Sequence, residues 1–133
     1  MFKILIVEDN LPFRDSLKEI LMVRFPGLAI DEAREGNEAM EKVNSLSPDL
    51  IFMDIKLPGE NGLELTGRIK ARYPDMKIII LTSYDLLEYR EAAARFGAND
   101  FLTKGSSSGK EILKLVESLL PWASSPTNFN TGS

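Results

Sequence analysis

Four apolar residues, Leu50-Ile51-Phe52-Met53, lead directly into Asp54, and a Pro58-Gly59 turn follows. A short apolar run that ends in turn residues is typical of a strand buried on both faces of a parallel sheet. Asp54 is therefore predicted to lie where a core strand leaves the sheet. A carboxylate in that position must be solvated, be paired, or bind a positive group.

Four other segments are predicted as strands because apolar, largely β-branched residues run together or alternate in them: 3–7, 28–33, 77–81 and 100–103. The segment 28–33 alternates only weakly and is expected near a sheet edge. Apolar residues at helical spacing predict helices between the strands: from Pro12 to about Phe25, from Gly36 to before Pro48, from Asn61 to before Pro74, from Asp85 to Phe96, and from Ser108 to before Pro121. Cap spacings at Asn61–Glu64, Asp85–Glu88 and Ser108–Glu111 are expected to begin the last three helices.

Five strands that alternate with five helices predict an α/β protein whose parallel sheet is covered on both faces. The length of 133 residues suits one such domain. We expect the domain to cover residues 1–121. Residues 122–133, rich in Ser, Thr, Asn and Pro, are expected to form a flexible tail or a truncated linker.

The composition excludes several kinds of chemistry. The net charge of −4 argues against direct nucleic-acid binding, which needs a Lys/Arg-rich face. No apolar run approaches the roughly 20 residues that span a bilayer. Met1-Phe2-Lys3 leads straight into a strand, so we expect a cytoplasmic protein without a signal peptide. Because the chain has no Cys and no His, any chemistry must use carboxylates, hydroxyls, lysine and a cation that prefers oxygen ligands.

Polar residues follow four of the predicted strands: Glu8-Asp9, Asp54, Thr82-Ser83 and Lys104. In open parallel sheets the carboxyl ends of the strands meet at one edge, where ligands bind, so these groups are expected to lie together. Three carboxylates at one place favour a bound cation, and Mg²⁺ fits oxygen ligands. Asp54 could then act as a nucleophile on phosphorus, with Lys104 and Thr82 contacting the phosphoryl oxygens.

Each of these residues, taken alone, has a simpler interpretation. Asp54 would be a solvated turn residue, Glu8-Asp9 an acidic helix start, Thr82 a helix cap, Lys104 a surface lysine and Phe101 a core residue. Together these simpler interpretations require the same arrangement at four strand ends by accident, which weakens them.

From residue 2 to about 120 the chain resembles a response-regulator receiver domain of two-component signalling. The matching segments are Ile6-Val7-Glu8-Asp9, Met53-Asp54 with Leu57-Pro58-Gly59 and Asn61-Gly62, Leu81-Thr82-Ser83, and residues 97–104 from Gly97 to Lys104. The resemblance implies a doubly wound, flavodoxin-like (β/α)5 fold with strand order 2-1-3-4-5. It also implies a signalling switch that is not a dedicated enzyme, although it catalyses its own phosphotransfer from phosphohistidine and a slow autodephosphorylation.

The resemblance also implies the roles of the site residues. Asp54 would be the phosphoacceptor and Lys104 would pair with the phosphoryl oxygens. Thr82 would follow the phosphoryl group and Phe101 would rotate as the aromatic switch. For the metal, the resemblance implies that Asp9 and Asp54 bind Mg²⁺ directly, that Glu8 binds it through water, and that the Lys56 backbone carbonyl is a further ligand. Mn²⁺ could substitute for Mg²⁺. For the loss of phosphate, the resemblance implies that Lys56 and Tyr84 tune the rate of dephosphorylation.

Two features depart from the common family pattern. Glu8 stands where many members have Asp, and Gly105 stands where most have Pro. A non-proline loop is frequent in receivers attached to a LuxR/NarL-type helix-turn-helix domain, so we expect the receiver of such a transcriptional regulator, in a truncated chain rather than a stand-alone one. The expected partners are a sensor histidine kinase or phosphotransfer protein, and a second copy on activation.

Three other classes of protein could share parts of this pattern. An aspartate-nucleophile phosphatase would need a second carboxylate where Lys56 stands. A nucleotide- or flavin-binding domain would need glycines in the segment 8–12, which is acidic and has none. A receiver-like module that is never phosphorylated would not need the intact acidic set.

Overall fold

The computed structural model describes residues 1–105 and 109–121. Its core is a five-stranded parallel sheet in the order β2-β1-β3-β6-β7, which confirms the predicted order 2-1-3-4-5. The strands are β1 (Lys3–Val7), β2 (Ala29–Ala33), β3 (Leu50–Met53), β6 (Lys77–Thr82) and β7 (Asp100–Thr103). The weakly alternating segment forms β2 at the sheet edge, as expected.

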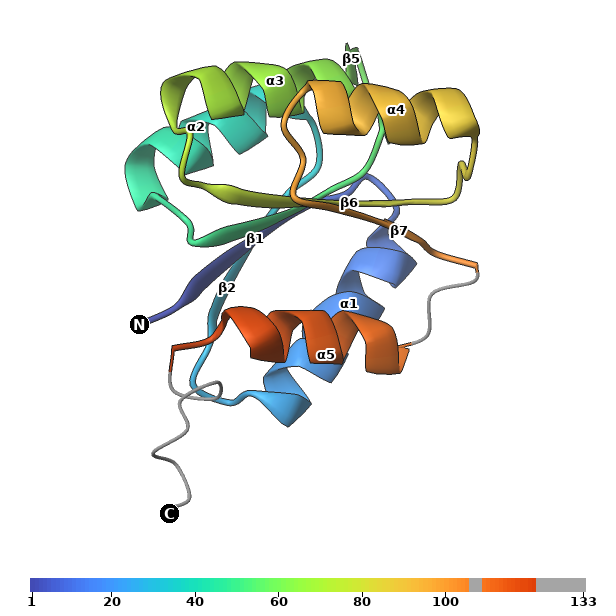
Figure 1. Ribbon diagram of the computed structural model, residues 1–133. Helices are drawn as coiled ribbons and strands as arrows, with labels where there is room; N and C mark the ends of the chain where they lie inside the picture. Colours follow the sequence, from blue (N-terminus) through green and yellow to red (C-terminus); the bar gives the residue numbers. More distant parts are fainter. Residues whose placement is uncertain (106–108, 122–133) are drawn as a thin grey trace.

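Helices cover both faces of this sheet, as Figure 1 shows. On one face lie α2 (Gly36–Leu46), α3 (Gly62–Arg72) and α4 (Leu87–Arg95); on the other lie α1 (Leu11–Arg24) and α5 (Gly109–Leu119). Two apolar clusters fill the space between sheet and helices, one on each face. The doubly wound α/β fold predicted from the sequence is therefore confirmed.

Successive residues of the central strand β3 alternate between the two clusters. Leu50 and Phe52 pack toward α1 and α5, whereas Ile51 and Met53 pack toward α2 and α3. All four are at most 1% exposed. A strand with both faces covered has no need of polar residues, which is why its sequence is an unbroken apolar run.

Two details of the structure differ from the sequence-based expectation. A small antiparallel pair, β4 (Lys56–Leu57) and β5 (Glu60–Asn61), was not predicted and surrounds the Pro58-Gly59 turn. The prediction that Asp85 caps α4 was wrong: the N-cap is Leu86, with no side-chain cap bond, and the Asp85 carboxylate instead accepts a hydrogen bond from Arg90 Nε at 2.6 Å.

The other two predicted caps have different outcomes. Asn61 does cap α3, because its side-chain oxygen accepts a hydrogen bond from the Leu63 backbone N–H. Ser108, the predicted cap of α5, and the tail 122–133 lie outside the described residues, so the assignment of residues 1–121 to one domain and 122–133 to a tail stays a prediction. Within the described part of the chain, no helix is long and apolar enough to span a bilayer.

Candidate functional site

The carboxyl ends of β1, β3 and β7 bring Glu8, Asp54 and Lys104 together. The Lys104 ammonium lies 2.6 Å from Glu8 Oε1 and 3.4 Å from Asp54 Oδ2. The backbone continues the sheet pairing up to this point, since the Asp54 N–H donates to the Val7 carbonyl at 3.1 Å. One cation is thus shared by two carboxylates from neighbouring strands.

Both carboxylates are buried. Glu8 is 3% exposed and Asp54 is 7% exposed. The narrow space behind them, lined by apolar residues of β1, β3, β6 and α1, leaves no room for a water molecule. Burial raises the pKa of Glu8, the nearby Asp54 charge raises it further, and hydrogen bonds from Lys104 and Asn10 oppose the rise. Burial therefore makes Glu8 harder to ionise, and the Lys104 ammonium beside it favours the charged carboxylate.

The start of α3 packs directly against Asp54. The Gly62 N–H donates to the Ile55 carbonyl at 2.7 Å. A Cβ atom on Gly62 would lie 1.8 Å from the Asp54 carbonyl oxygen, so no larger residue fits without moving the backbone. One Asp54 carboxylate oxygen accepts a hydrogen bond from the Ile55 N–H at 2.8 Å, while the other faces Lys104. The neighbouring elements thus fix where Asp54 can lie.

The other predicted site residues are held less directly. Thr82 is fully buried at the end of β6, and its carbonyl accepts a hydrogen bond from the Lys104 N–H at 2.8 Å. Asp9 is exposed beside Glu8. Phe101 is half-buried on β7, with the Arg90 guanidinium 4.7 Å from the centre of its ring. The structure therefore brings Glu8, Asp54 and Lys104 into contact, with Thr82 joined to Lys104 through the backbone.

Lys56 and Tyr84 contact each other at the edge of the site. Lys56 lies two residues after Asp54, and Tyr84 lies two residues after Thr82. The Lys56 ammonium is 5.2 Å from the centre of the Tyr84 ring, within the range of a cation–π contact. The Tyr84 N–H also approaches the Thr82 hydroxyl oxygen, at 3.4 Å.

Two residues of α1 that contact the site were missed by sequence reasoning. Arg14 is 7% exposed, and its guanidinium donates to the Glu8 carbonyl and to Glu32 Oε1, both at 2.7 Å. The ring of Phe13 lies 4.4 Å from the Lys104 ammonium. A signal for Arg14 was present, because it shares a buried helical stripe with Leu17 and Leu21, where a charged residue needs a partner.

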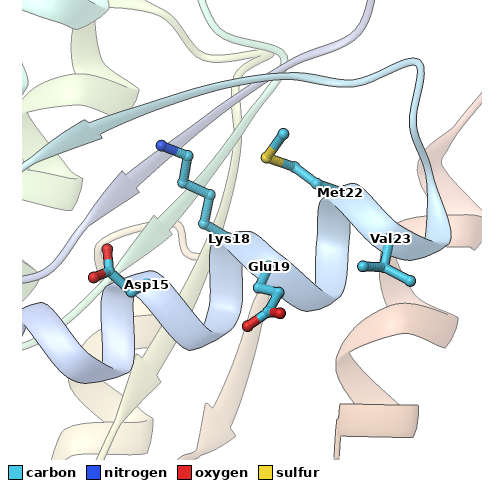
Figure 2. Close-up of a pocket in the computed structure, with 5 residues that line it drawn as sticks. All are labelled: Asp15, Lys18, Glu19, Met22 and Val23. Atoms are coloured by element: carbon cyan, nitrogen blue, oxygen red, sulfur yellow. The ribbon is translucent and has the colours of Figure 1, made fainter.

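A shallow hollow runs along the outer side of α1, away from these carboxylates. It is lined by residues of α1 alone, which Figure 2 shows projecting from one helix: Asp15, Lys18, Glu19, Met22 and Val23. Met22 is 49% exposed and Val23 is 78% exposed. A hollow lined by a single exposed helix does not enclose a ligand, so the candidate site remains the one at the carboxyl ends of the strands.

The carboxylate oxygens at the carboxyl ends of the strands are ligands that suit a hard divalent cation. Glu8 and Asp54 already share one positive group, and oxygen is the only donor type that these acidic residues offer. Across residues 1–105 and 109–121, no three carboxylates lie close enough together to form a ready-made metal cluster. The residues thus fit Mg²⁺ by their chemistry, while the Lys104 ammonium supplies the positive charge between Glu8 and Asp54.

Comparison with known proteins assigns the class of this chain. The sequence model of the response regulator receiver domain matches residues 4–117, and the chain belongs to that family. Members of this family are signalling proteins of two-component systems and not dedicated enzymes. The resemblance noted in the sequence is thereby confirmed.

Relatives and solved structures agree with this assignment. The oxygen regulatory protein NreC of Staphylococcus carnosus is 38% identical over 105 residues, which cover 78% of this chain and 48% of that protein. The transcriptional regulatory protein LnrK of Bacillus subtilis is 36% identical over 116 residues, covering 87% of this chain and 52% of that protein. This chain therefore spans about half the length of these curated relatives.

Among solved structures, a CheY-like receiver domain from Methanospirillum hungatei superposes with a TM-score of 0.81 at 32% identity, covering 90% of this chain and 94% of that one. A LuxR-family two-component response regulator from Aurantimonas sp. SI85-9A1 gives a TM-score of 0.80 at 30% identity, covering 88% of this chain and 83% of that one.

Proposed function

We propose that this receiver domain is a phosphorylation-dependent switch, in which Asp54 accepts a phosphoryl group from a sensor histidine kinase or a phosphotransfer protein. The observation that carries this proposal is the Lys104 ammonium shared between the buried carboxylates of Glu8 and Asp54. The chain has no His, so the phosphohistidine donor belongs to another protein or segment.

The transfer needs little beyond positioning and charge neutralisation. An Asp54 carboxylate oxygen forms a bond to phosphorus, the phosphorus–nitrogen bond of the donor phosphohistidine breaks, and the electron pair leaves with the imidazole. Lys104 lies close enough to Asp54 to move its ammonium onto the phosphoryl oxygens. Asp54 and Lys104 thus serve as nucleophile and electrostatic partner.

We assign the metal-binding role to the acidic residues of the site. Asp9 and Asp54 would bind Mg²⁺ directly, Glu8 would bind through water, and the Lys56 backbone carbonyl would add an oxygen. When bound, the ion neutralises negative charge on the phosphoryl oxygens. The response regulator Rcp1, whose structure is similar to this chain at 25% sequence identity, has been solved in an Mn²⁺-bound form. This similarity supports Mn²⁺ as a substitute for Mg²⁺.

The added phosphate charge would then change the surface formed by α4, β7 and α5. Thr82 and Lys104 would move toward the phosphoryl group, and Phe101 would rotate into the space that Thr82 leaves. The Arg90 guanidinium over the Phe101 ring connects that rotation to α4. Such a population shift needs a differential stabilisation of about 1–3 kcal/mol.

Lys56 and Tyr84 would set how long the phosphate persists. Lys56 and Tyr84 lie two residues after Asp54 and Thr82 and contact each other, so a bulky ring and a cation would together hinder a water molecule that approaches Asp54. Replacing Tyr84 with Ala should let the attacking water approach and shorten the phosphorylated lifetime; an unchanged or longer lifetime would count against this role.

The names of the relatives support an output in transcription. Because LnrK is named as a transcriptional regulator and a LuxR-family structure is similar, we assign this receiver to a LuxR/NarL-type transcriptional regulator that acts in the cytoplasm. Phosphorylation would favour a homodimer, and the receiver itself would not contact nucleic acid.

Incubation with acetyl phosphate and Mg²⁺ tests the proposal without a kinase. We expect a phosphoryl adduct on the wild-type chain, its absence when the metal is chelated, and its absence in Asp54→Asn. Asp75→Asn is the matched control, since Asp75 is exposed in the turn before β6. An adduct that persists in Asp54→Asn would overturn the assignment.

A further inference from the structure

Tyr89 forms part of a small cation–aromatic cluster beside the site. The Lys56 ammonium lies 5.2 Å from the centre of the Tyr84 ring and 5.7 Å from the centre of the Tyr89 ring. The two rings contact each other edge to face, with centroids 6.3 Å apart and planes 86° apart. One ammonium therefore faces two rings that also pack on each other.

The members of this cluster differ in how firmly the fold holds them. Tyr84 is 43% exposed and lies in the loop after β6, so much of its side chain faces solvent. Tyr89 lies in the first turn of α4 and is half-buried against the apolar cluster between α4 and the sheet. Its backbone N–H donates to the Leu86 carbonyl at 3.0 Å. Tyr89 is thus the anchored member.

The cluster joins two segments that lie next to Asp54, the proposed phosphoacceptor. Lys56 belongs to the segment that follows Asp54, and Tyr84 belongs to the segment that follows Thr82. Without Tyr89, the Tyr84 ring and the Lys56 side chain would lose their common contact with the helix and would sample more orientations.

We propose that Tyr89 is a positioning residue for phosphate retention: it holds Tyr84 and Lys56, the two residues assigned above to slowing phosphate loss from Asp54. This inference rests on the proposed phosphorylation of Asp54. In the step that it slows, a water oxygen bonds to phosphorus, the bond from phosphorus to the Asp54 oxygen breaks, and inorganic phosphate and the free carboxylate result, with the water's protons passing to phosphate or solvent. Tyr89 acts on this step through Tyr84, without touching the reacting atoms.

The test compares phosphorylated lifetimes of matched variants after labelling with acetyl phosphate. Tyr89→Leu should lose its phosphate roughly two- to tenfold faster, the factor expected for losing one aromatic contact. Tyr89→Phe should match the wild-type lifetime because it keeps the ring. Tyr73→Leu is the control: Arg72 also lies over the Tyr73 ring, at 5.6 Å, but this pair ends α3 at the opposite end of the sheet.

Two further measurements separate a positioning role from general destabilisation. In a Tyr84→Leu background, adding Tyr89→Leu should change the lifetime little, because Tyr89 acts through Tyr84. In the unphosphorylated protein, the Lys56 side-chain protons should be shifted upfield in NMR spectra by the rings, and Tyr89→Leu should reduce that shift.

An unchanged lifetime in Tyr89→Leu, an equal change in Tyr73→Leu, or a full effect in the Tyr84→Leu background would each overturn the inference while leaving phosphorylation of Asp54 intact. If the wild-type chain takes up no phosphate at all, the proposed function fails, and the retention role fails with it.

Discussion

The Lys104 ammonium lies 0.8 Å closer to the Glu8 carboxylate than to Asp54, at 2.6 Å against 3.4 Å. Lys104 therefore has a role in the unphosphorylated protein: its positive charge compensates the negative charge of the Glu8 carboxylate, whose pKa is raised by burial. A cation that holds two buried carboxylates should matter for stability even when the protein is not phosphorylated.

Replacing Lys104 with Met should accordingly destabilise the domain. We expect a loss of about 1–3 kcal/mol in the free energy of unfolding, because Glu8 and Asp54 then lack their shared cation. Mg²⁺ should restore more stability to this variant than it adds to the wild type, since a ligand that binds only the folded state stabilises it. Urea unfolding with and without Mg²⁺ measures both effects, and exposed Lys114→Met serves as the control. Equal stabilities for Lys104→Met and the wild type would contradict this role.

Arg14 and Lys18 share one partner but differ in burial. Both bind the Glu32 carboxylate, at 2.7 Å and 3.0 Å, yet the Arg14 side chain is 9% exposed and that of Lys18 is 38% exposed. We expect Arg14→Gln to cost about 2 kcal/mol or more, because it also removes the donor to the Glu8 carbonyl. Lys18→Ala should cost less than about 1 kcal/mol. Similar losses of unfolding free energy for Arg14→Gln and Lys18→Ala, measured by urea unfolding, would show that burial does not determine the contribution of these two residues.

Glu32 gives the pH dependence a definite sign. The Lys18 hydrogen bond, with that from Arg14, lowers the pKa of Glu32 below its usual 4.5. Its contribution to stability is therefore complete above the unfolded-state pKa and is lost as the pH falls through the lower folded-state pKa. We expect the stability gap between wild type and Glu32→Gln to be largest near neutral pH and to shrink below about pH 4.5. If the difference in stability between wild type and Glu32→Gln grew on acidification, the pKa of Glu32 would be raised and not lowered in the folded state.

Gly62 and Gly36 provide a comparison of two close contacts. A Cβ on Gly62 would meet the Asp54 backbone carbonyl, whereas a Cβ on Gly36 would meet the end of the Glu60 side chain, which can move. Gly62→Ala should cost about 1–3 kcal/mol and reduce phosphate uptake because Asp54 shifts. Gly36→Ala should be close to neutral in both. Unfolding curves and acetyl phosphate labelling of the two variants decide the point.

The fold was predictable because its three inner strands, β1, β3 and β6, are nearly pure apolar runs. Residues Leu50 to Met53 are covered by helices on both faces of the sheet, so burial alone explains their apolar sequence. The polar residues that follow the strands all lie at the carboxyl ends of those strands. The contact of Glu8 and Asp54 with Lys104 follows from that geometry. Parallel topology carried the prediction, since it places all strand ends together.

The details that sequence reasoning missed depend on side-chain pairings that helix and strand periodicity does not specify. Asp85 has the spacing of a helix cap, but Arg90 competes for its carboxylate. Arg14 is separated by 18 residues from Glu32, which pairs with it on β2. The two rings that face Lys56 come from different segments. Local patterns do not specify such pairs, because the tertiary structure chooses between alternatives of similar energy.

Chemical mapping of the phosphorylated residue tests the central claim most directly. After acetyl phosphate and Mg²⁺ treatment, borohydride reduces an aspartyl phosphate to homoserine, which peptide mass spectrometry can locate in the sequence. We predict homoserine at position 54, with Asp9 unmodified and with no homoserine when Mg²⁺ is chelated. Homoserine at another aspartate, with position 54 unmodified, would contradict the account.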